Sequence, residues 1–127
     1  MRNHWFFRSR AHQCDLIPKI ATGFGAGIGG QGLLCDAVSG GIMALDIEFS
    51  RNQVEKQERK VYWFTLEFLN RFKKEHGNLT CRELTCCDFN TEEGKNKYED
   101  ENMWKTKCKQ CIATATALVL ELIKEKT

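Results

Sequence analysis

Seven cysteines stand among the 127 residues of this chain, and they limit how it can fold. An odd number of cysteines cannot pair completely, which argues against a disulfide framework. A chain of this length also buries a core without such staples. In a reducing compartment, clustered cysteines more often bind metal, hold an iron–sulfur cluster or exchange electrons. Five of the seven lie in the second half of the chain: Cys81, Cys86, Cys87, Cys108 and Cys111.

Length, charge and hydropathy exclude several other classes of protein. The composition predicts a soluble protein with an atypical leader over residues 1–14 and one helical, cysteine-rich domain over 15–127. A net charge of +2 is too small to indicate binding to nucleic acid. The first ten residues lack the apolar run of a signal peptide, and the glycines and acids within 23–47 disfavour membrane insertion. We therefore expect a cytoplasmic protein.

Proline and glycine divide the first part of the chain. Pro18 is the only proline, and long stretches without proline favour helices. We expect a short helix over residues 15–21, with Asp15 as its cap. The run from Gly23 to Gly32 predicts an irregular loop between helices, because glycine permits positive φ angles and close backbone approach.

A second helix is predicted over residues 33–46, and its apolar face includes a cysteine. Gly40 and Gly41 would let another helix approach this one closely. The face is built by residues at helical spacing: Cys35, Val38, Ile42 and Leu45.

The third helix has the strongest sequence signals. Ser50 and Gln53 form a capping box, with Phe49 and Val54 placed as a hydrophobic staple. Gly77 is placed as the C-cap. Between these ends an apolar stripe repeats at steps of three or four residues: Val61, Phe64, Phe68 and Phe72.

The remaining sequence predicts two more helices separated by a loop. Thr80 and Glu83 form a capping box that opens a short fourth helix. The polar residues 88–103 predict a surface loop, and the last helix is expected over about 106–124. No alternating strand pattern stands out. The prediction is an all-α bundle of about four to five helices with a glycine-rich interhelical loop.

The expected helix starts give several cysteines an electropositive setting. Cys81 follows the cap residue Thr80, where backbone N–H groups favour an anion, so we expect its thiol pKa to be lowered. Cys108 and Cys111 lie in the first turns of the last helix and are expected to behave in the same way. Cys35 lies near the start of its helix. The thiols would converge if the bundle gathers these helix starts at one end. Three lysines flank the turns around Cys108: Lys105, Lys107 and Lys109.

The spacing of the cysteines leaves the kind of site open. Cys108-Lys-Gln-Cys111 matches C-x-x-C, but the βαβ context of a thioredoxin-like site is missing. A zinc site would pair this motif with Cys81, Cys86 or Cys87, although their spacing lacks the usual compact knuckle. An iron–sulfur cluster needs about four thiolates, which the chain contains. The plainer alternative is that the cysteines pack as small apolar residues.

The glycine run also satisfies a nucleotide-binding pattern. Residues 25–30 match G-x-G-x-x-G, a fingerprint that requires a strand before it and a helix opening within it. The preceding segment contains Pro18 and makes a poor central strand. A tight turn between two helices is the favoured interpretation, and nucleotide binding is the weaker one.

Several segments together resemble the putative redox-active protein family named for its C-GCAxxG-C-C cysteine pattern. The resemblance implies a small helical protein with a cysteine-based redox role. Matched by position, Cys35, Cys81 and Cys108 are the signature cysteines. The matching stretches follow the order of the family: residues 21–29 (ATGFGAGIG), 35–40 (CDAVSG), 78–84 (NLTCREL) and Cys108.

Two departures separate this chain from the family pattern. Asp36 stands where the family has glycine, and nothing matches an N-terminal helix with an Asn-Cys-Ala-Gln-like motif. Cys14 lies too close to the glycine run to be that cysteine. The resemblance therefore implies a member truncated or altered at its N-terminus. Cys111, Cys86, Cys87 or a partner subunit would then complete the site.

We therefore predict a thiol site with Cys35, Cys81 and Cys108 as its catalytic residues. Cys111 joins these three as a fourth ligand if the site holds an iron–sulfur cluster or zinc. The activity would be electron transfer or thiol–disulfide exchange, by an electron carrier or a thiol oxidoreductase. The expected partner is a second copy of the chain or a redox partner protein. The alternative is a non-enzymatic helical interaction module with structural cysteines.

Overall fold

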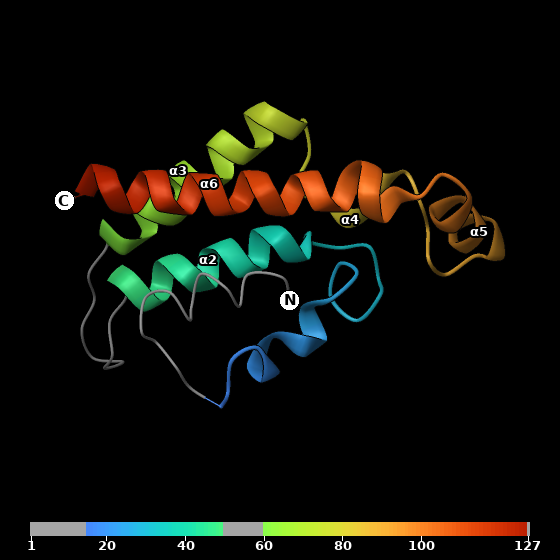
Figure 1. Ribbon diagram of the computed structural model, residues 1–127, viewed down its shortest axis with the longest axis horizontal. Helices are drawn as coiled ribbons and strands as arrows, with labels where there is room; N and C mark the ends of the chain where they lie inside the picture. Colours follow the sequence, from blue (N-terminus) through green and yellow to red (C-terminus); the bar gives the residue numbers. More distant parts are fainter. Residues whose placement is uncertain (1–14, 50–59, 127) are drawn as a thin grey trace.

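The protein is described by a computed structural model over residues 15–49 and 60–126 (Figure 1). Most of these residues are helical, and apart from one isolated antiparallel bridge between Leu34 and Thr80 they contain no β-structure. The all-α prediction is confirmed. The elements follow in this order: the 3₁₀ helix η1 (Lys19–Phe24), α2 (Asp36–Phe49), α3 (Lys60–His76), α4 (Cys81–Thr85), α5 (Glu92–Asp100), the π-helical turn η2 (Trp104–Cys108) and α6 (Lys109–Lys126).

Helices α2, α3 and α6 pack against one another and form the body of the bundle. Figure 1 shows that α2 and α6 run in the same direction and that α3 runs against them. The N-terminal ends of α2 and α6 therefore lie at the same end of the bundle, where α4 also lies. No described helix is both long enough and apolar enough to span a membrane.

The core forms where the predicted aromatic stripe of α3 meets α2 and α6. Phe64, Phe68 and Phe72 are buried, as predicted, while the side chain of Val61 lies outside the described part. The ring of Phe68 occupies the space that a Cβ atom on Gly41 would need, so the predicted close approach at Gly41 is confirmed. Other core side chains come from the two parallel helices: Val38, Leu45, Ala115, Val119 and Leu122.

Helix α2 starts later than predicted because the residues before it pair with the start of α4. The Cys35 N–H donates to the Leu79 carbonyl at 2.9 Å, and the Cys81 N–H donates to the Leu33 carbonyl at 2.7 Å. These two bonds hold the segments ahead of α2 and α4 side by side. The pairing therefore brings Cys35 and Cys81 next to each other at the end of the bundle.

The predicted loop over residues 88–103 is wrong, because α5 occupies most of it. Thr91 caps the helix by accepting the Gly94 N–H at 3.0 Å, and Glu92 and Glu93 stand in its first turn, where the helix dipole favours acids. Gly94 lies against the backbone of Asp88, where a Cβ would clash. Thr91 and the acids after it are a helix-start signal in the sequence, but the polar composition of residues 88–103 favoured the prediction of a loop.

The first predicted helix also differs from the structure. Residues 15–18 form turns, and the 3₁₀ helix η1 begins only at Lys19. The α conformation is sterically disfavoured for a residue that precedes a proline. Ile17 stands at that position, which opposes a regular helix from residue 15 through Pro18. The capping box of Ser50 and Gln53, and Val54 of the predicted staple, lie outside the described residues.

Candidate functional site

A pocket of about 100 Å³ lies at the end of the bundle where α2, α4 and α6 begin. Four cysteines line it: Cys35 just before α2, Cys81 at the start of α4, Cys108 at the end of η2 and Cys111 in the first turn of α6. The predicted convergence of these thiols is therefore confirmed. All four are free thiols in the structure.

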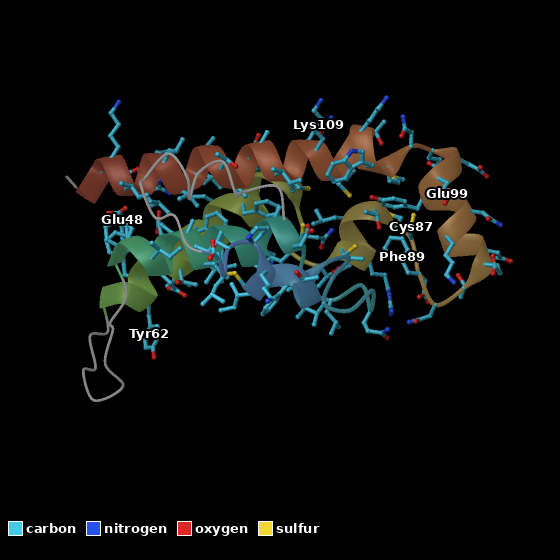
Figure 2. All side chains as sticks on the ribbon, turned by 60° about the horizontal axis from the view of Figure 1, so that its bottom comes forward. Glu48, Tyr62, Cys87, Phe89, Glu99 and Lys109 are labelled. Atoms are coloured by element: carbon cyan, nitrogen blue, oxygen red, sulfur yellow. The ribbon has the colours of Figure 1, made fainter. Side chains whose placement is uncertain are left out.

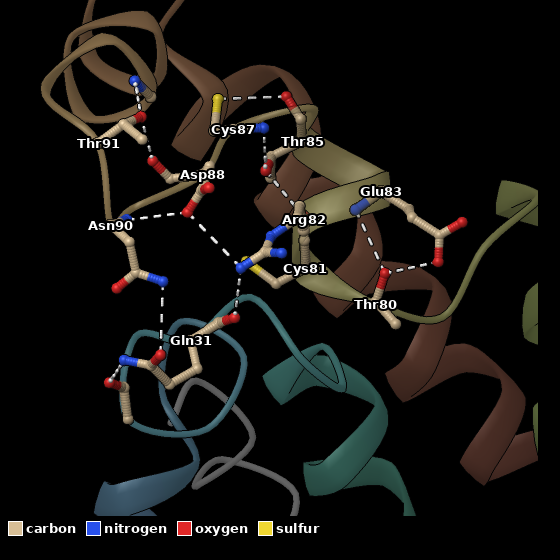
Figure 3. A network of polar contacts seen from close by, with 12 residues as sticks. Gln31, Thr80, Cys81, Arg82, Glu83, Thr85, Cys87, Asp88, Asn90 and Thr91 are labelled. Carbon is tan, nitrogen blue, oxygen red and sulfur yellow. Dashed lines mark hydrogen bonds and ion pairs between the residues drawn. The ribbon is translucent and has the colours of Figure 1, made fainter.

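The start of α4 is fixed by the predicted cap and by a buried threonine. Thr80 Oγ1 accepts the Glu83 N–H at 3.2 Å and donates to a carboxylate oxygen of Glu83 at 2.8 Å. Thr85 Oγ1 donates to the Cys81 carbonyl at 2.8 Å and accepts the Cys87 N–H at 3.2 Å (Figure 3). Together these bonds determine where the backbone of Cys81 lies at the pocket.

Arg82 joins the glycine-rich loop to the segment after α4. Its guanidinium donates to the Gln31 carbonyl at 3.1 Å and pairs with the Asp88 carboxylate at 3.6 Å. Asn90 adds a bond from its side-chain amide to Gln31 Oε1 at 3.4 Å (Figure 3). This network holds the loop, and Ala26 within it, against the pocket.

The glycine-rich loop is a left-handed turn that uses its own amide groups. Ala26 and Ile28 adopt positive φ angles of 50° and 66°, a conformation that L-residues adopt at a cost of about 1–2 kcal/mol each. The N–H groups of residues 28–33 donate to carbonyls of residues 23–28. A phosphate-binding loop needs such amides free for the ligand. The internal bonds therefore favour the interpretation of this run as a tight turn between helices.

Cys35 is the thiol whose surroundings stabilise a negative charge. Cys35 stands directly before α2, and hydrogen bonding with the Cys111 thiol and with the N–H groups of Ala37 and Val38 lowers its pKa. The bond from Cys111 is the largest influence. These bonds outweigh burial and the charge of Asp36, and they lower the pKa of Cys35 to about 7.

The predicted lowering of the other thiol pKa values is wrong. Burial, with the nearby Cys108, Cys35 and Asp36, raises the pKa of Cys81 to about 12. Burial also raises the pKa of Cys108, although a bond from Tyr98 opposes it. Donation to Cys35, followed by burial, raises the pKa of Cys111. Among the four pocket thiols, only Cys35 has a lowered pKa, and hydrogen bonding with Cys111 and with the N–H groups of Ala37 and Val38 is the cause.

Tyr98 is a site residue that the sequence analysis missed. It lies on α5, lines the pocket and places its hydroxyl 3.5 Å from the Cys108 sulfur. The ring of Phe89 packs edge-on against it, with 5.1 Å between the centroids. Burial raises the pKa of Tyr98, so the hydroxyl keeps its proton at neutral pH. Lys107 lines the same pocket and adds a positive charge.

Cys86 and Cys87 do not join the pocket. Cys86 is exposed at the left-handed C-cap of α4, with φ of 57°. Cys87 lies in the segment that leads from α4 to α5 (Figure 2), and its buried thiol donates to the Thr85 carbonyl at 3.3 Å. Within residues 15–49 and 60–126, no three His, Cys, Asp or Glu side chains are arranged to hold a metal ion.

Four free thiols around one pocket of a small helical protein are the feature expected of a thiol-based redox protein. The sequence profile of the family described as "Putative redox-active protein (C_GCAxxG_C_C)" matches residues 7–122. This chain belongs to that family, which confirms the resemblance and supports a general redox role. Comparison with curated proteins found no match, and neither did comparison with solved structures.

Proposed function

We propose that Cys35 and Cys111 form a dithiol–disulfide couple that carries two electrons. The observation that supports it is that both cysteines line the same pocket and belong to the same buried cluster. Oxidation would remove two electrons and two protons and join the two sulfurs, and reduction by an external dithiol would reverse the step. The thiolate is the reactive form in such exchanges, and Cys35 is the thiol that ionises near neutral pH.

The other two pocket thiols have supporting roles in this proposal. Cys81, which we predicted as catalytic, has its pKa raised to about 12, and a protonated thiol is a poor nucleophile. Cys108 is partly exposed, while the other three are buried. A redox partner protein that supplies electrons would therefore reach Cys108 first. The free thiols of the described residues also suit the reducing conditions of the cytoplasm, where we place the protein.

A redox titration of the full chain tests the couple. The protein is equilibrated with mixtures of reduced and oxidised dithiothreitol, and its free thiols are counted at each potential. We expect two thiols to disappear in one two-electron step. C35S and C111S should both lose this step, whereas C86S, which alters an exposed thiol outside the pocket, should keep it. A step of unchanged size and potential in C35S or C111S would contradict the proposal.

Metal binding is the second candidate function, because four cysteine sulfurs surround one pocket. Four thiolates are the ligand set of many zinc sites and iron–sulfur clusters. The side chains of Cys35, Cys81, Cys108 and Cys111 would have to turn toward a common point. Anaerobic purification with iron, zinc and sulfide analysis tests this. Bound metal that disappears in C81S would support the candidate, and a metal-free, colourless protein would reject it.

The interaction-module alternative is supported by apolar side chains on the outer face of α3. Tyr62 is 67% exposed and points away from the bundle (Figure 2), and Trp63 and Leu66 are 49% and 57% exposed. This face would serve a homodimer. Sedimentation over a range of protein concentrations tests it, and a chain that stays monomeric throughout would reject this alternative.

A further inference from the structure

We infer that the pocket takes small hydroperoxides and that the Cys35–Cys111 couple reduces them. This inference rests on the proposed redox couple and names its oxidant. Three features carry it: the small size of the pocket, the two thiols that line it, and a hydroxyl proton donor that lines the same pocket.

The pocket restricts what can reach the reactive sulfur. Its volume of about 100 Å³ is well below the roughly 300–1,000 Å³ of pockets that hold drug-sized ligands. Cys35 is only 8% exposed. A disulfide of a peptide or protein must align two sulfurs and their attached carbons with the attacking thiolate. The reacting group of a hydroperoxide is only two oxygen atoms, so a small hydroperoxide can enter a pocket that excludes the disulfide of a peptide or protein.

The pocket also supplies the proton that a departing oxygen requires. The Tyr98 hydroxyl lines the pocket and lies 3.5 Å from the Cys108 sulfur, so it stands among the thiols rather than apart from them. Burial keeps this hydroxyl protonated by raising its pKa. Lys107 lines the same pocket, and its positive charge would stabilise the negative charge that develops on the leaving oxygen.

The chemistry balances over two steps. The Cys35 thiolate attacks one peroxide oxygen, the O–O bond breaks, and the leaving oxygen takes a proton from Tyr98 to become water or an alcohol. Cys35 is then a sulfenic acid, and Tyr98 recovers a proton from solvent. Once Cys35 is oxidised, Cys111 no longer donates to a thiolate, so the largest influence that raises its pKa is gone. In the second step the Cys111 sulfur attacks Cys35, the S–O bond breaks, and the hydroxide leaves with the Cys111 proton as water. One hydroperoxide is reduced and one disulfide is formed.

Hydrogen peroxide is the probe for the experiment, with the reduced full chain as reactant. Stopped-flow mixing followed by acid quench and peptide mapping gives the oxidation rate at each cysteine. The exposed Cys86 serves as the internal reference. We expect Cys35 to be oxidised at least tenfold faster than Cys86. C111S should stop at the sulfenic acid of Cys35, gaining one oxygen that dimedone captures.

Y98F separates proton donation from a purely structural effect. General acid catalysis contributes about 10²–10⁴-fold, so we expect the peroxide reaction of Cys35 to slow about a hundredfold. Alkylation of Cys35 by iodoacetamide releases iodide, which needs no proton, so its rate should stay within about twofold. Equal losses in both reactions would overturn the role of Tyr98 as donor.

The outcomes distinguish this inference from the function on which it rests. A protein that forms the couple in dithiothreitol but oxidises Cys35 no faster than Cys86 would overturn the hydroperoxide inference alone. Loss of the couple in dithiothreitol would overturn the proposed function as well. Rapid oxidation at Cys35 with disulfide formation to Cys111 would support both.

Discussion

At the scale of single residues, the reactivity of Cys35 follows from its place just ahead of α2. Hydrogen bonding with the Cys111 thiol and with two backbone N–H groups lowers its pKa, against the effects of burial and of the charge of Asp36. Cys81 and Cys108 line the same pocket, but burial raises the pKa of each and keeps the thiol protonated. The ionisable groups that face this site from the other elements are Cys81, Tyr98, Lys107, Cys108 and Cys111.

The hydrogen bond from Cys111 should set the pH at which Cys35 reacts. Because thiolate is the reactive form, alkylation of Cys35 should rise with pH and level off above its pKa of about 7. In C111A the largest lowering influence is removed, so the midpoint should move up toward the ordinary thiol value near 8.5. The measurement is the iodoacetamide rate at Cys35 by peptide mapping from pH 5 to 10. An identical midpoint in both proteins would disprove the role of this bond.

At the scale of elements, the short helix α4 depends on its cap. Thr80 bonds both the backbone and the side chain of Glu83, and it opens the helix that begins with Cys81. T80A should lower the free energy of unfolding by about 1 kcal/mol, within the usual range for a lost N-cap. Urea unfolding measures this change. T65A, a threonine-to-alanine change inside α3, is the control and should show little loss; equal losses would argue against capping.

The crossing of α2 and α3 depends on the absence of a side chain at Gly41. A Cβ there would overlap the fully buried ring of Phe68. G41A should therefore cost about 1–3 kcal/mol of unfolding free energy, as overpacked cores do. The matched control is G23A, because a Cβ at that position meets nothing within 4 Å. Thermal unfolding of both variants decides the matter, and a G41A protein as stable as G23A would refute the close approach.

Strong periodicity and a cap next to an apolar run predicted helices correctly, whereas boundaries set by long-range pairing were not predictable from the sequence. The stripe of Phe64, Phe68 and Phe72 and the cap at Thr80 are local signals, and both are confirmed. The start of α2 depends on pairing between Leu34 and Thr80, which lie far apart in the chain. Helix α5 was not predicted because its residues are mostly polar and no apolar stripe follows the cap at Thr91. Tyr98, which lies on this helix, was therefore not predicted as a pocket residue.

At the scale of the whole molecule, the site exists because α2 and α6 run in the same direction (Figure 1). Their shared orientation brings Cys35 and Cys111 together across a long stretch of chain. The sequence placed both cysteines near helix starts, but the direction of packing is a tertiary property that periodicity does not carry. The four cysteines that line the pocket were therefore predictable as candidates, while the differences between their pKa values required the structure.

The oxidised protein should be more stable than the reduced one. A disulfide between Cys35 and Cys111 would close a long loop that links α2 to α6, and such loops contribute about 3–5 kcal/mol in the chain-entropy estimate. The midpoint of urea unfolding should therefore rise after oxidation. C35S treated in the same way provides the control and should not change. An unchanged or lower midpoint in the oxidised wild-type protein would contradict this expectation.

The most direct test of the redox couple is to identify the disulfide itself. The reduced full chain is oxidised with one equivalent of oxidant, its remaining thiols are blocked in acid, and the linked peptides are sequenced by mass spectrometry. We predict that Cys35 is joined to Cys111 in most of the molecules. Linkage mainly through Cys86 or Cys87, with Cys35 and Cys111 recovered as free thiols, would contradict it.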